Sequence, residues 1–133
     1  MPVYVGLGCR RGCPADTLGS LLEQTLKAHG LPLDAVAGLA SIDLKQDEPG
    51  LQQLARRLKV PLLFFSAAQL AAFEQRLSHR SAVAYQHSGC YGVAESAALA
   101  LAEHFAGTAQ LRVTRTLLAD ASLALASAPG FGG

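Results

Sequence analysis

The sequence predicts an α/β fold in which helices cover both faces of a mostly parallel sheet. Apolar runs of strand length alternate with stretches whose leucines recur at helical spacing, and this alternation is typical of parallel sheets. The last two apolar runs are separated only by residues 119 and 120, which predicts an antiparallel pair in the same sheet. A length of 133 residues, half of them hydrophobic, suits one domain with a proper core.

The first half of the chain supplies two strands and two helices. Residues 3–7 and 35–42 are apolar runs, the first stopped by glycines, and both are predicted as buried strands. Between them a helix is expected, because Pro14 suits the first helical position and Gly-Leu-Pro at 30–32 ends a helical pattern. Its apolar stripe consists of Leu18, Leu21, Leu22 and Leu26. Residues 51–58 carry a second, shorter stripe of the same kind.

The second half begins with a third strand and ends with the antiparallel pair. Residues 60–65 form the strand, and Ser66 is a suitable N-cap for the next helix. That helix is expected to bear Leu70, Phe73 and Leu77. Residues 93–105 are apolar almost all round, so we expect a helix buried between other elements. The paired strands are expected at 111–118 and 121–126, whereas residues 81–87 are too polar for a central strand and are not assigned.

Charge and composition narrow the function classes. A net charge of +1 argues against a nucleic-acid-binding surface, and no apolar stretch reaches the about 18 residues that a membrane span needs. The N-terminus is typical of a strand and not of a leader, so we expect a soluble, cytoplasmic protein. Its three cysteines are expected to be reduced thiols. We expect one domain over residues 1–128 and a flexible, glycine-rich tail over 129–133.

Three marked segments are expected at one edge of the sheet, namely residues 6–16, 41–50 and 87–95. Loops that follow parallel strands emerge at the same edge, where α/β proteins hold their ligands. The first and third segments are glycine-rich turns at helix N-termini, whose unpaired amides attract an anion. Arg10 and Arg11 add positive charge that strengthens the attraction of an anion to these amides. A solvated surface turn is the alternative interpretation of the two arginines.

Two further cations bear on this prediction. Lys45 lies in the second segment. Arg115 follows Leu111 and Val113 at a spacing of two, so a regular strand would aim it to the same side as two core residues. A charge there needs a partner, which is either a bound anion or an internal carboxylate. The candidate carboxylates are Asp43, Asp47 and Glu95.

The motifs do not match a nucleotide or metal site. The stretch G-L-G-C-R-R-G lacks the ending of a P-loop and the glycine spacing of a dinucleotide fingerprint, so no cofactor is predicted. Cys9 and Cys13 with Cys90 and His87 have a permissible ligand spacing, but small thiols fit the pattern as well and no metal is predicted. Glu95 is expected to cap a helix or pair with an arginine, with acid–base chemistry as the alternative.

Three stretches in register carry a resemblance to a known family. They are G-L-G-C-R-R-G, A-G-L-A-S-I-D-L-K-x-D-E-x-G-L and S-G-C-Y-G-V-A-E-S-A-A-L, and the similarity runs from about residue 3 to about residue 126. Together they resemble the CobE family, which is also the C-terminal domain of CbiG proteins in cobalamin biosynthesis. The resemblance implies a three-layer α/β/α fold with a mixed sheet of about five strands, and a role in handling a corrin precursor. In CbiG-type proteins the whole assembly is credited with opening a lactone ring on a cobalt-containing precorrin.

A corrin precursor is a flat, partly apolar ring fringed with carboxylates, so it needs cations and backbone donors around an apolar floor. The expected ligand-binding residues are Gly8, Cys9, Arg10, Arg11, Gly12, Asp43, Lys45, Ser88, Gly89, Cys90, Tyr91, Gly92, Glu95 and Arg115. The resemblance favours a carrier or accessory protein of the aerobic pathway that binds a precorrin intermediate. Two alternatives remain: a precorrin-lactone hydrolase using Lys45, Glu95 or His87 in proton transfer, and a scaffold that docks onto other cobalamin-biosynthesis enzymes.

Overall fold

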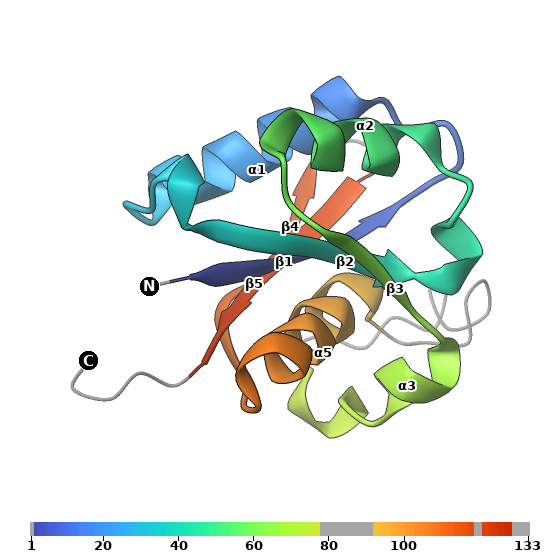
Figure 1. Cartoon of the computed structure of the whole chain (residues 1–133), viewed down its shortest axis with the longest axis vertical. Coiled ribbons are helices and arrows are strands. Elements are labelled where there is room, and N and C mark those ends of the chain that lie inside the picture. Colours follow the sequence, from blue (N-terminus) through green and yellow to red (C-terminus); the bar gives the residue numbers. More distant parts are fainter. Residues whose placement is uncertain (1, 78–91, 119–120, 129–133) are drawn as a thin grey trace.

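Five strands form one mixed sheet in the computed structural model, which describes residues 2–77, 92–118 and 121–128. The strands are β1 (Val3–Cys9), β2 (Val36–Ile42), β3 (Leu62–Phe65), β4 (Gln110–Leu118) and β5 (Ala121–Ser127). Their order across the sheet is β3-β2-β1-β5-β4 (Figure 1). The pairings of β2 with β1 and β3 are parallel, whereas β5 runs antiparallel to both of its neighbours. Only β5 is therefore reversed relative to the other strands.

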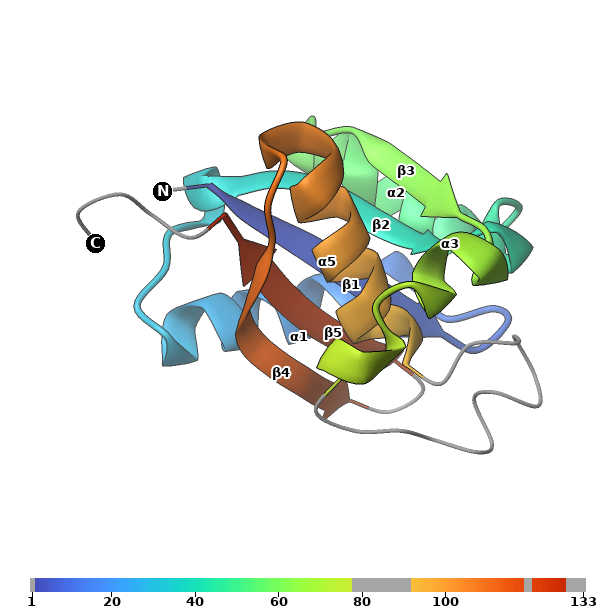
Figure 2. The ribbon, with the colours of Figure 1, turned by 90° about the horizontal axis from the view of Figure 1, so that it is seen from below.

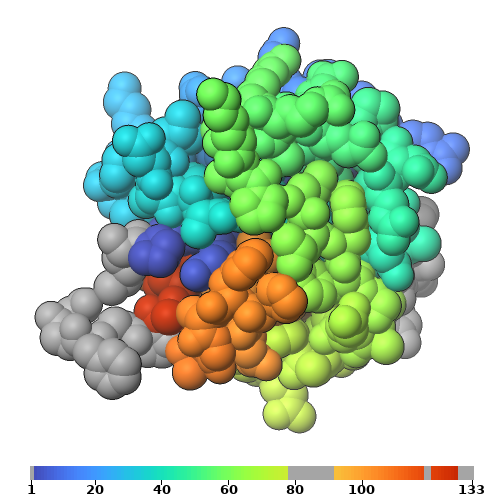
Figure 3. Space-filling view, in the orientation of Figure 1, coloured from blue at the N-terminus to red at the C-terminus, as the bar shows by residue number. Residues whose placement is uncertain are grey.

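Helices cover both faces of this sheet, which confirms the three-layer α/β/α prediction. One layer holds α1 (Ala15–Ala28) and α2 (Pro49–Leu58). The other holds α5 (Val93–Ala106) and the short α3 (Ala67–Ala71), as the two perpendicular views show (Figures 1 and 2). In the space-filling view, the green atoms of the α2 region lie at the top, and the orange atoms of α5 and yellow-green atoms of α3 lie below (Figure 3). No helix in these described ranges has the length and hydropathy needed to cross a membrane.

The central strand β1 divides the core into two clusters by simple alternation. Val3, Val5 and Leu7 are fully buried on the α1 and α2 side. Tyr4 faces the other way, where its ring stacks on Phe105 of α5 at a centroid separation of 6.0 Å. Gly6 points to the same face, and a Cβ built there would lie only 1.8 Å from a backbone oxygen of α5. The helix therefore rests directly on the strand backbone.

Small side chains accompany this close approach in the buried part of α5. Its residues from Ala94 to Ala102 are all buried, and five of these nine are alanine. The prediction of a buried helix that is apolar almost all round is confirmed for this part of α5, which packs on β1, β2 and β5 and also contacts α3. The prediction that Glu95 lies in the first turn of this helix is also confirmed.

Several predicted boundaries differ from those observed. β1 does not stop at residue 7 but continues through Gly8 and Cys9, because these residues pair with β5. Pro14 takes the N-cap position and α1 begins one residue later. Ser66 caps α3 as expected, with its hydroxyl accepting the backbone N–H of Gln69. The helix nevertheless ends at Ala71, and a 3₁₀ turn, Glu74–Arg76, replaces the helix predicted to reach Leu77. Residues 81–87 and the tail at 129–133 lie outside the described residues.

Candidate functional site

The carboxyl ends of β1 and β2 place two polar turns side by side, as the parallel pairing requires. The first turn comprises Arg10 to Cys13 and the second begins with the 3₁₀ turn Asp43–Lys45. The start of α5 lies at the same edge, since a Cβ at Gly8 would contact Val93 at 3.8 Å. Three segments therefore meet there, as predicted. Of the third segment Gly92 and Glu95 are described, whereas His87, Ser88, Gly89, Cys90 and Tyr91 lie outside the described residues.

The first turn, here called the arginine turn (residues 10–13), carries two exposed arginines. The backbone N–H of Cys13 donates to the carbonyl of Arg10 at 3.1 Å, which closes a four-residue β-turn. Gly12 occupies the third position of this β-turn with φ of 82°, a value that residues other than glycine strongly disfavour. Arg10 and Arg11 are exposed. The glycine thus forms the tight turn that displays the arginines.

A buried carboxylate ties this turn to the second one. Glu48 is only 7% exposed, and its Oε1 accepts the backbone N–H of Gly12 at 2.7 Å. The backbone N–H of Glu48 donates to the carbonyl of Lys45 at 3.0 Å. One residue therefore contacts both cation-bearing turns. Sequence reasoning missed it, because a glutamate immediately before Pro49 predicts the start of a helix but not a contact across 36 residues.

The second turn combines a cation with an exposed apolar side chain. Asp43 and Lys45 are half-buried, whereas Leu44 between them is 64% exposed. This turn therefore holds a large hydrophobic side chain open to solvent beside a lysine. The sequence prediction included Asp43 and Lys45 but overlooked Leu44.

Cys9 lies within the electrostatic reach of the same cluster. The pKa of its thiol is raised to about 11, chiefly by burial and also by the neighbouring Cys13 and Glu48, while Lys45 opposes the rise. The thiol is therefore protonated at neutral pH and is poorly suited to nucleophilic or metal chemistry. Within the described ranges, no group of three or more His, Cys, Asp or Glu residues could hold a metal ion.

Two residues expected in the first loop belong instead to β1. Gly8 pairs with Ser122 and Cys9 pairs with Ala121, so both continue the sheet. The hydroxyl of Ser122 also donates to the carbonyl of Gly8 at 3.4 Å. The position of Gly8 within a paired strand does not favour the role of loop amide donor that we expected for it.

Arg115 does not follow the regular alternation that the sequence suggested. The register of β4 shifts between Leu111 and Val113 and again between Val113 and Thr116. As a result Leu111 packs with the α5 side of the core and Val113 with the α1 and α2 side, so the prediction that they share one face is wrong. Arg115 is a half-buried residue, and its backbone N–H donates to Oε2 of the buried Glu95 at 2.8 Å. Glu95 thereby fixes the irregular part of β4 to the first turn of α5.

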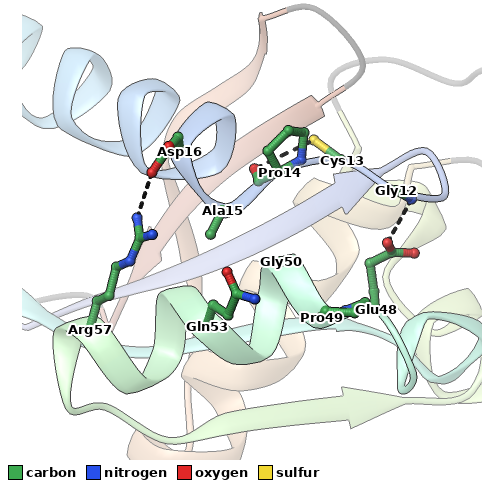
Figure 4. A pocket seen from close by; sticks show the side chains of 10 residues that line it. All are labelled: Gly12, Cys13, Pro14, Ala15, Asp16, Glu48, Pro49, Gly50, Gln53 and Arg57. Carbon is green, nitrogen blue, oxygen red and sulfur yellow. Dashed lines mark hydrogen bonds and ion pairs between the residues drawn. The ribbon is translucent and has the colours of Figure 1, made fainter.

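A hollow of about 220 Å³ adjoins the arginine turn on its α1 and α2 side (Figure 4). It is lined by Gly12, Cys13, Pro14, Ala15, Asp16, Glu48, Pro49, Gly50, Gln53 and Arg57. Arg57 and Asp16 form an exposed ion pair of 2.8 Å. Pockets that hold drug-sized ligands have volumes of about 300 Å³ or more, so this hollow is smaller than they are. Arg10, Arg11 and Lys45 are not among its lining residues.

These features define an α/β protein of the three-layer class, in which two turns bearing Arg10, Arg11 and Lys45 lie at the carboxyl edge of the parallel strands. The family model described as "Cobalamin synthesis G C-terminus" matches residues 3–126. The chain belongs to this family, whose members include CobE and the C-terminal domain of CbiG, and it is a cobalamin biosynthesis protein.

Curated relatives are of two kinds. Protein CobE of Sinorhizobium sp is 37% identical over 124 residues, which cover 93% of this chain and 79% of the relative. The cobalt-precorrin-5A hydrolase of Salmonella typhimurium is 43% identical over 72 residues, or 54% of this chain. The hydrolase of Priestia megaterium is 30% identical over 95 residues, or 71% of this chain. The matches span only 20% and 25% of the lengths of these two hydrolases.

Solved structures agree with this assignment. The crystal structure of CobE, a protein from the cobalamin (vitamin B12) biosynthetic pathway, matches with a TM-score of 0.90 at 50% identity, over 94% of this chain and 89% of that chain. The cobalamin biosynthesis protein chiG of Agrobacterium tumefaciens matches with a TM-score of 0.73 at 32% identity, over 96% of this chain and 99% of that chain.

Proposed function

We propose that the protein binds a polycarboxylated corrin precursor on the rim formed by the arginine turn and the Asp43–Lys45 turn, and that it acts as a carrier or accessory protein of the aerobic pathway. The observation that carries this proposal is the linkage of two cation-bearing turns through Glu48 in a chain of the cobalamin biosynthesis family. On this proposal the protein works in the cytoplasm and hands its ligand to other enzymes of the pathway.

The chemistry of the rim matches such a ligand. Guanidinium groups bind carboxylates with two parallel hydrogen bonds, and Arg10 and Arg11 are exposed where such contacts can form. The exposed side chain of Leu44 offers an apolar contact to the face of the ring. Lys45, half-buried beside it, adds a cation on the other side of the Glu48 link. The two linked turns thus carry cations and an exposed apolar side chain, which the ligand's acidic fringe and apolar plane require.

The binding experiment uses cobyrinic acid, a corrin ring with free acetate and propionate side chains, and its methyl ester as the matched neutral probe. Titration of the protein is followed by the visible absorption of the corrin and by calorimetry. We expect saturable binding of the acid that weakens with added salt, and much weaker binding of the ester. Equal binding of the two probes, or no binding of the acid, would overturn the proposal.

A hydrolase is the second candidate, because relatives that match part of their length to this chain are named cobalt-precorrin-5A hydrolases. Incubation with the cobalt-precorrin lactone, followed by mass spectrometry over time, separates the two functions. A carrier retains the ligand stoichiometrically with no change of mass, whereas a hydrolase releases a product of altered mass over many turnovers. A protein that neither retains nor converts any corrinoid would instead be a docking scaffold.

A further inference from the structure

We propose that Glu48 is a positioning residue for ligand binding, which holds the arginine turn in register with the turn that bears Lys45. This inference rests on the proposed function and names the group on which the geometry of the rim depends. Glu48 itself does not meet the ligand, because it is buried and its carboxylate is used by the backbone of Gly12.

The hydrogen bonds of Glu48 run in two directions. Its side chain accepts from Gly12 at 2.7 Å, and its backbone N–H donates to Lys45 at 3.0 Å. The arginine turn also has its own bond from Cys13 to Arg10, so Glu48 is not the only group that shapes it. What Glu48 adds is the relative position of two turns that come from different strands.

Close backbone packing between the start of α2 and the arginine turn also defines the relative position of the two turns. A Cβ at Gly50 would lie 2.3 Å from the carbonyl oxygen of Cys13, so the start of α2 rests on the chain that leaves the arginine turn. Figure 4 shows Glu48 reaching from the beginning of α2 to Gly12 across this contact. The turn is thus supported from below by Gly50 and held from the side by Glu48.

The sign of the effect separates positioning from simple electrostatics. A carboxylate beside an anion-binding rim repels the ligand, so removal of its charge alone should tighten binding slightly. Removal of a positioning group should weaken binding instead. Asp47 is the matched control, because it is exposed, lies next to Glu48 and carries the same charge.

The test compares Glu48→Ala, Glu48→Gln and Asp47→Ala with the unchanged protein. Cobyrinic acid and its methyl ester are again the probes. We expect Glu48→Ala to bind the acid about tenfold more weakly, the scale of one lost hydrogen bond to a charged group. Glu48→Gln keeps an acceptor oxygen and should restore most of the affinity, while Asp47→Ala should bind as well as the unchanged protein or slightly better. Circular dichroism and thermal melting establish that each variant is folded.

A second measurement needs no corrinoid. Trypsin cleaves after arginine, and a turn held at Gly12 fits the protease poorly, so limited digestion should cut after Arg10 or Arg11 several-fold faster in Glu48→Ala than in Asp47→Ala. If Glu48→Ala does not fold, Glu48→Asp replaces it, because the shorter side chain withdraws the acceptor while keeping the charge.

The outcomes distinguish the two levels of the proposal. If the unchanged protein binds cobyrinic acid and Glu48→Ala binds it as tightly, the positioning role is wrong and the proposed function stands. The same holds if Glu48→Gln binds as weakly as Glu48→Ala. If the unchanged protein does not bind the acid, the proposed function fails, and the digestion rates alone decide whether Glu48 holds the turn.

Discussion

Replacement of Gly6 by alanine tests the central packing contact of the fold. A Cβ at Gly6 would lie 1.8 Å from the carbonyl oxygen of Ala94 and 2.4 Å from the backbone nitrogen of Ala98. Both atoms belong to the backbone of α5, so no side-chain rotation can relieve the overlap, and the helix must move off the sheet. Gly6→Ala should therefore disturb the contact between α5 and β1 along its length.

The magnitude follows from two opposing contributions. Overpacking of a core costs about 1–3 kcal/mol, and a clash with rigid backbone belongs at the upper end of that range. Alanine in place of glycine in a strand gains about 0.5–1 kcal/mol from reduced chain entropy. We therefore expect a net loss of about 2 kcal/mol and a fall in Tm of roughly 10 °C.

Gly19→Ala is the matched control for this experiment. Gly19 lies inside α1, where a Cβ would meet only the side chain of Leu54 at an ordinary 3.6 Å. The same chemical change should here stabilise the protein by up to about 1 kcal/mol, through helix propensity. Urea unfolding followed by circular dichroism measures both variants, with the slope m serving as a check on two-state behaviour. If Gly6→Ala is as stable as the unchanged protein, α5 does not lie as close to β1 as described.

The remaining predictions concern the site and its support. Changing Arg10 and Arg11 together to alanine should weaken binding of cobyrinic acid by at least about tenfold and reduce the salt dependence of that binding. Tm should change little, because both residues are exposed. Unchanged affinity in calorimetry would place the ligand elsewhere. Ser41→Ala removes the buried hydroxyl that donates to the carbonyl of Leu7 at 2.7 Å, and should cost about 1 kcal/mol in urea unfolding; no loss would mean that this bond adds nothing. The pKa of Cys9 rises from 9.0 to about 11 on folding, so the native state keeps a proton that the unfolded state releases, and stability should fall as pH rises between these values. Unfolding of Cys9→Ser should show a smaller fall over that interval, and an identical pH dependence would contradict the assignment.

The sequence predicted the layers well because local pattern and global fold agree along most of the chain. The apolar runs that became β1 and β2, and the leucine stripe that became α1, are each decided by neighbours a few residues away. The extension of β1 to Cys9 depends instead on β5, which lies more than a hundred residues later and supplies its pairing partner. Glycine and cysteine after an apolar run look like a loop until that partner is known.

The site was predicted only in outline. Arg10, Lys45 and the start of α5 share the predicted edge because parallel strands force their loops together. Glu48 could not be chosen as a site residue, since its contact with Gly12 depends on how the start of α2 packs beneath the arginine turn. The direction expected for Arg115 relied on regular alternation, and two register shifts in β4 break that alternation. The ligand-binding roles of all these residues remain predictions.

The position of β5 has a consequence for how the chain reaches its native state. Although β5 is the last strand in the described chain, it lies between β1 and β4. A ribosome-bound chain ending before residue 121 would leave one side of β1 without its partner and the α5 layer resting on an incomplete sheet. The core can close only after residues 121–127 have emerged, so we expect the sheet to be completed late in folding, and removal of this strand to abolish the fold instead of trimming it.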